Sequence, residues 1–146
     1  MSPRWTVCHT RQLALVYVVV SLALLTSCSP SSQPAIKGSW TGTVRQPGYP
    51  PYSVEMTITA TKVGQIAGTV AYPELGCSGT LRCEEVSVTH VTFRESILEN
   101  SDGSCVDGAK IVLTVKSAQP ERAAIAFFTP DGSPAGNGEL ERIDAQ

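Results

Sequence analysis

Hydrophobic and polar residues alternate along the chain from about residue 39 to residue 128. Every second position carries an aliphatic, aromatic or small residue, and polar residues fill most of the positions between. The hydrophobic positions form successive short runs at 40–44, 54–58, 68–72, 86–93, 111–115 and 125–127, with a weaker last run around Leu140. A period of two is typical of β-strands with one buried face, and no window of eleven residues holds a helical stripe. The pattern therefore predicts an all-β domain.

The run 86–93 differs from the others because its alternation slips by one residue near Thr89 and His90. Val86 is in phase with Val88, and Val91 starts a second phase. A β-bulge inserts one extra residue into a strand and produces such a slip. The sequence therefore predicts one bulged strand here.

Turn signals separate the runs, among them the Pro and Gly residues of 46–48 and 73–76 and the pairs Asp102-Gly103, Asp131-Gly132 and Asn137-Gly138. Their spacing suits an antiparallel meander of about eight strands. Closing such a sheet would remove its exposed edges, so we favour a small up-and-down barrel over a sandwich. The opening Gly38-Ser39-Trp40 is similar to that of lipocalins, which are ligand-binding barrels, and this resemblance implies a lipocalin-like barrel.

The first 27 residues have the layout of an export signal. Arg4 and Arg11 precede an uncharged apolar run at 13–25, which makes about 20 Å of helix and is short of a bilayer core of about 30 Å. The run ends in Leu25-Thr26-Ser27-Cys28, which resembles a bacterial lipobox. The alternative is an ordinary signal peptide with a chance cysteine.

The lipobox resemblance implies cleavage before Cys28 and attachment of lipid, including palmitate, to Cys28. Residues 28–37 would then be the lipidated cysteine and a Ser/Pro-rich tether, and residues 38–146 an extracytoplasmic domain. Two acyl chains anchor a protein stably, so we expect it on the outer face of the cell membrane.

Size and charge exclude several classes of function. Residues 38–146 are one small domain, too short for a protein kinase or a dinucleotide-binding dehydrogenase. The chain has 11 Lys and Arg and 13 Asp and Glu residues. Because Arg4 and Arg11 leave with the signal, the mature net charge is about −4 with no basic stripe, and we expect no nucleic-acid partner.

Three cysteines remain in the domain after Cys8 is cleaved and Cys28 is lipidated. An exported domain sits in an oxidising compartment, so one disulfide is expected. If residues 77–83 form one strand, its ends are about 20 Å apart, too far for a Cys77–Cys83 bond. Cys77 follows a glycine, and Cys105 lies in a Gly/Asp-rich loop. We therefore favour a Cys77–Cys105 bond over a Cys83–Cys105 bond. Cys83 would then be either a small buried apolar residue, which we favour, or a redox or metal-binding thiol.

A further resemblance rests on four segments of the chain. They are 38–44 (GSWTGTV), 72–81 (YPELGCSGTL), 93–97 (FRESI, of which Phe93-Arg94-Glu95 and Ile97 match) and 105–113, which begins with Cys-Val-Asp-Gly. The set resembles a small extracytoplasmic domain of actinobacterial lipoproteins and of some actinobacterial serine/threonine protein kinases. The resemblance implies the Cys77–Cys105 disulfide. It implies no kinase activity, because the chain has no Gly-rich loop, HRD or DFG motif.

Five residues are candidates for a ligand-facing site: Trp40, Tyr49, Tyr52, Arg94 and Glu95. Tyr49 and Tyr52 flank two prolines and would form a rim at a barrel mouth, unless they are ordinary loop residues. Arg94 and Glu95 lie on opposite faces of one strand, so one of them would point inward, where a charge is costly unless it is paired or lines a ligand site. The alternative, which we favour, is an edge or bulged strand with both charges in solvent.

Catalysis and metal binding have little support in the sequence. After the signal is removed His90 is the single histidine, and no serine lies in a Gly-x-Ser-x-Gly motif. Glu84 and Glu85 near His90 would face opposite ways on a strand, so we expect no metal, no cofactor and no catalytic residue. The sequence predicts a lipid-anchored, monomeric binding or sensing domain whose partner is a small molecule or an envelope protein. A packed structural or interaction lipoprotein is the alternative, and a small hydrolase is least favoured.

Overall fold

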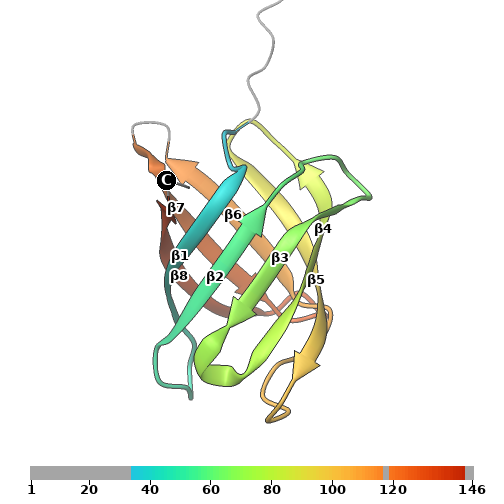
Figure 1. Ribbon diagram of the computed structural model, residues 1–146, viewed down its shortest axis with the longest axis vertical. Helices are drawn as coiled ribbons and strands as arrows, with labels where there is room; N and C mark the ends of the chain where they lie inside the picture. The colour runs from blue at the N-terminus through green and yellow to red at the C-terminus, as the bar shows by residue number, and fades with distance from the viewer. Residues whose placement is uncertain (1–33, 117–118, 144–146) are drawn as a thin grey trace, which may run out of the picture. The chain divides into compact units, whose positions relative to one another are not determined.

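The computed structural model describes residues 34–116 and 119–143, which form a closed antiparallel barrel in the order β1-β2-β3-β4-β5-β6-β7-β8 (Figure 1). The strands are β1 (Gly38–Arg45), β2 (Tyr52–Ile58), β3 (Ile66–Tyr72), β4 (Cys77–Val86), β5 (His90–Asn100), β6 (Lys110–Lys116), β7 (Gln119–Phe128) and β8 (Pro134–Ile143). A single 3-10 turn, η1 (Pro73–Leu75), follows β3. The predicted up-and-down barrel of about eight strands is confirmed.

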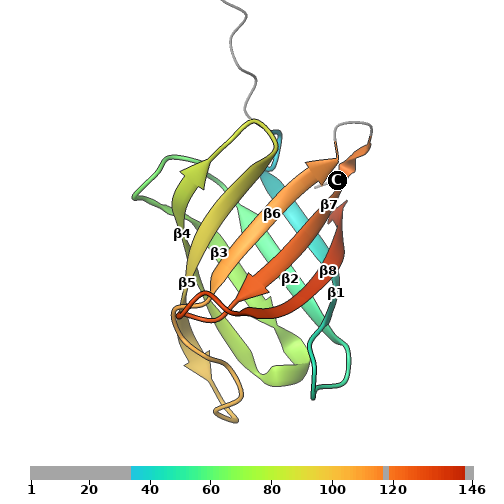
Figure 2. The ribbon, with the colours of Figure 1, turned by 180° about the vertical axis from the view of Figure 1, so that it is seen from behind.

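The barrel closes where β1 pairs with β8, with Gly42 opposite Leu140. Each strand pairs with its neighbour in the chain, as Figure 2 shows for β4 to β8 from behind. The loops between β1 and β2, β3 and β4, β5 and β6, and β7 and β8 gather at one end, at the bottom of Figure 1. The other end receives the chain ahead of β1.

Along each strand, every second side chain points into the barrel, as the sequence pattern predicts. Trp40, Phe93, Leu81, Leu113 and Leu140 are all fully buried. Eight strands enclose an interior that is either filled by side chains or holds one small ligand. Large side chains fill this interior over most of its length.

Trp40 fills the end where the chain enters β1. Its indole Nε1 donates a hydrogen bond of 2.7 Å to the carbonyl of the fully buried Ile36. The Arg142 guanidinium lies 4.5 Å from the centre of the Trp40 ring and donates to the carbonyls of Lys37 and Ala35. This end is therefore closed by a packed and hydrogen-bonded layer.

The expected bulge near His90 is wrong, because the chain turns there. β4 ends at Val86 and β5 begins at His90, so the two phases of the alternation belong to two strands. The Ser87 side chain accepts hydrogen bonds from the backbone N–H groups of Thr89 and His90. A serine hydroxyl thus makes a turn that lacks the usual Gly or Pro.

The expected turn at Asn137-Gly138 is also wrong, since both residues lie inside β8. Gly138 faces inward beside β1, and a Cβ atom there would lie 2.2 Å from the Thr43 carbonyl oxygen. The glycine marks a close approach of two backbones instead of a turn.

The Cys77–Cys105 disulfide is confirmed, with the two Cα atoms 6.5 Å apart. It joins the start of β4 to the loop between β5 and β6. Cys83 is free and buried inside the barrel.

The expected leader and lipidated Cys28 lie outside the described residues, as does most of the tether. Over the residues that the structure describes, no helix has the length and apolarity needed to cross a membrane.

Candidate functional site

A cavity of about 80 Å³ opens inside the barrel at the end opposite Trp40. Its walls include side chains of β2, β3, β5 and β7 and parts of the loops at this end. The side chains that define it are Gln46, Tyr52, Tyr72, Leu75, Glu95 and Phe127. A buried water occupies about 10–15 Å³ on this measure, so the cavity has room for a few waters or one small molecule.

Glu95 is the charged residue within this cavity. It follows Val91 and Phe93 at the inward positions of β5, and 3 % of its surface is exposed. The favoured expectation that Arg94 and Glu95 are both solvated is therefore wrong for Glu95. The sheet is closed, so β5 has no free edge, and the side chain that continues the inward phase points inside.

The Glu95 carboxyl lies in surroundings that disfavour its charge. Its pKa is raised from 4.5 to about 7, chiefly by burial and to a smaller extent by the charge of Asp107. The Tyr72 hydroxyl acts in the opposite direction by favouring the ionised form. The two groups are close enough for this influence, but no hydrogen bond of normal geometry joins Glu95 Oε1 or Tyr72 Oη to the other or to any other described residue. Such unpaired buried groups cost about 1–3 kcal/mol each unless something else bonds to them.

Aromatic rings line much of the same cavity. The Tyr52 and Tyr72 rings are 6.0 Å apart and edge to face, and Phe127 lies 6.1 Å from Tyr72. The Tyr52 hydroxyl donates a hydrogen bond of 2.9 Å to Gln46, which fixes its ring. Burial, with the nearby Glu95 charge, raises the pKa of Tyr52 to about 12 and that of Tyr72 well above 10, so both phenols stay protonated.

The loops around the cavity are held in place by specific bonds. Glu74 of η1 accepts hydrogen bonds from the backbone and side chain of Ser53. Asn100 bonds both backbone groups of Cys105, whose disulfide ties the loop to β4. Asp107 accepts a hydrogen bond of 2.8 Å from the backbone of Ile97. The cavity is thus framed by fixed loops.

The other candidate residues lie in different places. Trp40 is at the closed end and does not line this cavity. Tyr49 is in the loop between β1 and β2 at the open end, with 46 % of its surface exposed. Arg94 points outward, where it forms an ion pair of 2.8 Å with Glu84. Of the five candidates, the structure brings Tyr52 and Glu95 together in the cavity.

Sequence reasoning missed Tyr72, Gln46 and Phe127. Tyr72 had a usable signal, because it is in phase with Val70 and ends a strand just before a Pro/Gly turn. Gln46 had none, since its position depends on how the loop between β1 and β2 folds back toward Tyr52.

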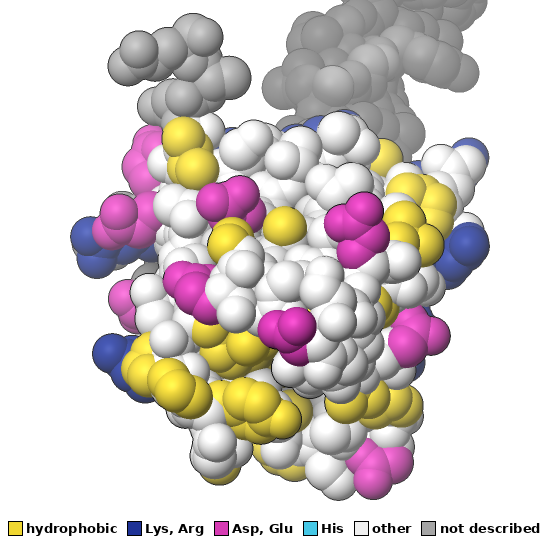
Figure 3. Space-filling view, turned by 60° about the horizontal axis from the view of Figure 1, so that its bottom comes forward, with side chains coloured by type: hydrophobic (Ala, Val, Ile, Leu, Met, Phe, Trp, Pro, Cys, Tyr) yellow, Lys and Arg dark blue, Asp and Glu magenta, His cyan; other side chains and the backbone are white. Residues whose placement is uncertain are grey.

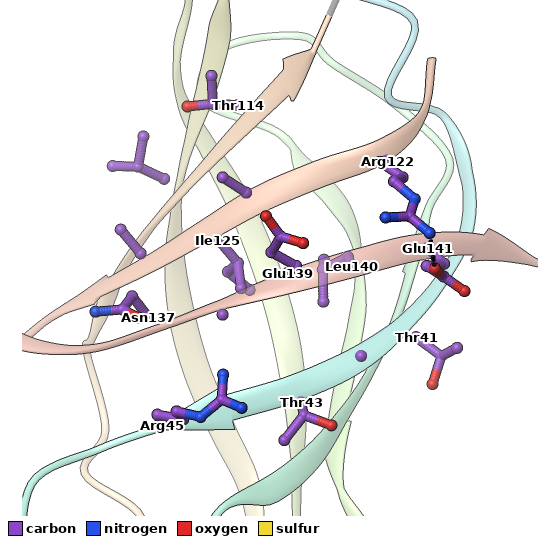
Figure 4. Close-up of a pocket in the computed structure, with 15 residues that line it drawn as sticks. Thr41, Thr43, Arg45, Thr114, Arg122, Ile125, Asn137, Glu139, Leu140 and Glu141 are labelled. Atoms are coloured by element: carbon purple, nitrogen blue, oxygen red, sulfur yellow. Dashed lines mark hydrogen bonds and ion pairs between the residues drawn. The ribbon is translucent and has the colours of Figure 1, made fainter. Parts of the chain in front are cut away.

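A second, larger hollow lies on the outside of the barrel wall formed by β1, β6, β7 and β8 (Figure 4). Its polar side chains include Thr41 and Thr43 of β1 and Thr114 of β6, as Figure 4 shows. Arg122 and Glu141 form an exposed ion pair of 2.8 Å at its edge. The lining is the solvated outer face of a curved sheet, and the two buried unpaired polar atoms found among the described residues, on Tyr72 and Glu95, belong to the other cavity.

His90 begins β5 at the closed end and bonds to Ser87 Oγ at 2.8 Å through Nδ1. Its Nε2 is 3.9 Å from Glu85, while Glu84 is paired with Arg94. Within the ranges 34–116 and 119–143, no three metal-ligating side chains come together.

No protein-family model matches the chain, and no curated protein matches it.

Proposed function

We propose that this protein is a small-molecule-binding or sensing barrel held at the bacterial cell envelope by a lipid on Cys28, and that it binds without catalysis. The observation that carries the binding proposal is the Glu95 carboxyl, buried in a cavity with an oxygen that no described residue bonds. A polar group in this position gains a partner when a ligand binds, and that gain is specific to a ligand of the right chemistry.

The two ends of the barrel support the same proposal. A packed layer of Trp40, Ile36 and Arg142 closes one end, while rigid aromatic side chains surround an opening at the other. Residues 34–37 lead into β1 at the closed end. The cavity therefore lies at the end opposite to the one where the chain enters β1.

Native mass spectrometry of the full chain, purified in mild detergent from bacterial membranes, tests the binding proposal. We expect a retained small molecule that is lost in the Ala135→Trp variant, because Ala135 lines the cavity and a Trp side chain would fill it. The matched control is Ala124→Trp, which places the same side chain in the outer hollow and should keep the molecule. A mass without a retained molecule, or loss in the control alone, would contradict the proposal.

The lipid anchor has its own test. Cys28→Ala removes the thiol that would carry the lipid, so the variant should appear in the medium. A variant still firmly bound to the membrane would contradict anchoring through Cys28.

A structural or protein-interaction role is the second candidate, and exposed hydrophobic side chains at the open end favour it. Leu98, Val106 and Tyr49 are 72 %, 61 % and 46 % exposed. Leu98 is the extra residue of a bulge, since Ser78 pairs with Glu99 and Gly79 with Ile97. Under this candidate Leu98→Ser would abolish capture of an envelope protein, and Ala135→Trp would leave that capture intact.

A further inference from the structure

The charged residues in the loops at the open end are all acidic. The four loops there, residues 46–51, 73–76, 101–109 and 129–133, contain Glu74, Asp102, Asp107 and Asp131 and no Lys, Arg or His. Figure 3 views this end and shows acidic side chains around it with hydrophobic ones between them. Basic side chains lie at the margin of this view, and Arg45 and Lys110 occupy the adjoining strand ends, but the loops that bound the opening are acidic. Acidic charge around an opening attracts cations and repels anions.

The basic side chains next in sequence to cavity residues point away from the cavity, and the first of them, Arg45, lines the outer hollow. Lys110 lies 4.7 Å from the centre of the Phe128 ring. Arg94 points outward and pairs with Glu84. The Glu95 carboxyl therefore has an open bonding position and no basic partner among the described residues.

The aromatic rings beside Glu95 provide the second part of a cation site. Tyr52 and Tyr72 both line the cavity, and their faces carry the partial negative charge that attracts ammonium groups. Two rings at an angle of 79° present differently oriented surfaces to one enclosed group. Paired aromatic residues with a carboxylate are the usual means by which proteins hold quaternary ammonium ions.

We propose that the ligand of this cavity is a small organic cation, whose ammonium group lies against the Tyr52 and Tyr72 rings and the Glu95 carboxylate. The inference rests on the proposed binding function and names its ligand class. The cavity volume limits the enclosed part of the ligand to a headgroup of a few heavy atoms. A longer ligand would extend from it past the exposed Val106 and Tyr49 side chains.

Calorimetry of the full chain in mild detergent, at about pH 8, tests this with probes of matched shape. Choline, tetramethylammonium and ethylammonium are the cations, 3,3-dimethylbutan-1-ol is the neutral isostere of choline, and 3,3-dimethylbutanoate is the anion. We expect choline to bind, and the neutral isostere and the anion to bind at least about tenfold more weakly than choline.

Glu95→Gln keeps the shape of the side chain and removes its charge, so it should weaken cation binding by about tenfold or more. The matched control is Glu55→Gln, the same change at an exposed outward position of β2, which should leave binding within about twofold. Equal binding of the alcohol, tighter binding of the anion, or an unchanged affinity in Glu95→Gln would overturn the cation proposal.

The outcomes separate this proposal from the binding function. Binding of the alcohol or the anion in the cavity would leave the binding function standing and reject its cationic ligand. Failure of every ammonium probe would also reject the cationic ligand, while a retained molecule in the mass spectrum would still support binding. If no probe binds and the mass spectrum shows no retained molecule, the binding function itself is rejected.

Discussion

Tyr72 and Glu95 approach each other inside the open end of the barrel, and the Tyr72 hydroxyl and Glu95 Oε1 each lack a hydrogen-bond partner among the described residues. Tyr72 closes β3 just before η1, and Glu95 lies in the middle of β5, so β4 separates the two strands in the sheet. The pair is a polar feature of an interior that is otherwise apolar over most of its length. This is the feature from which the binding proposal follows.

Glu95→Gln should change how stability depends on pH. The folded pKa is about 7 and the ordinary value 4.5, so ionising Glu95 costs nothing below about pH 4.5 and costs progressively more up to about pH 7. Above pH 7 the full cost is of the order of 3 kcal/mol. Tyr72 and Asp107 are the titratable groups that shift its pKa, and the phenols of Tyr72 and Tyr52 stay protonated through this range.

Urea unfolding near pH 4.5 and pH 8 measures this effect. At pH 8 we expect the free energy of unfolding of Glu95→Gln to exceed that of the wild type by up to about 3 kcal/mol. Near pH 4.5 the two free energies of unfolding should be nearly equal. Parallel pH profiles for the two proteins would show that Glu95 does not titrate in this range.

Cation binding should depend on pH in the same region. In the unliganded protein the pKa of Glu95 is about 7, so below pH 7 the Glu95 carboxyl group must lose its proton before it can pair with an ammonium group. Affinity should therefore fall about tenfold for each pH unit below 7 and level off above it. Calorimetry with choline from about pH 5 to pH 8 measures the profile. A flat profile would be inconsistent with an ion pair at Glu95.

Cys77→Ser should destabilise the barrel by about 3–4 kcal/mol, because it removes the disulfide that closes a loop between residues separated by 28 positions in the sequence. Without this cross-link the unfolded chain gains conformational entropy. Its stability should no longer respond to a reducing agent, whereas that of Cys83→Ala should still respond, since Cys83 is free. Denaturant unfolding with and without reductant checks both. A wild type that is insensitive to reductant after full reduction would contradict this role of the disulfide.

Arg142→Met should loosen the closed end. The change removes a guanidinium 4.5 Å from the Trp40 ring and its bonds to two carbonyls, while keeping an apolar stem. We expect a loss of about 1–3 kcal/mol and red-shifted Trp40 emission. Arg122→Met, which breaks an exposed ion pair, is the control and should cost under about 1 kcal/mol. Equal effects of the two variants would argue against a packed closing layer.

The fold could be predicted from sequence because alternation and turn spacing are local signals. The run 54–58 is one example, since Val54, Met56 and Ile58 all point into the core. The disulfide could be predicted because a strand between Cys77 and Cys83 separates them. The turn at Ser87 could not, since a side-chain hydroxyl replaces the usual Gly or Pro.

The site was harder to predict than the fold. Alternation alone places Glu95 in phase with Phe93, but the cost of a buried charge argues against that placement. The cost falls when burial raises the pKa of the carboxyl, which depends on the closed barrel. Tyr72 and Gln46 join Glu95 through long-range folding that no local pattern reports.

Intermolecular nuclear Overhauser effects from the methyl protons of bound choline give the most direct test of the account. In the full chain at about pH 8, we predict contacts to the ring protons of Tyr52 and Tyr72, both lost in Glu95→Gln. Contacts to Thr41 or Thr114 in the outer hollow, or no contacts at choline concentrations that saturate the calorimetric signal, would contradict it.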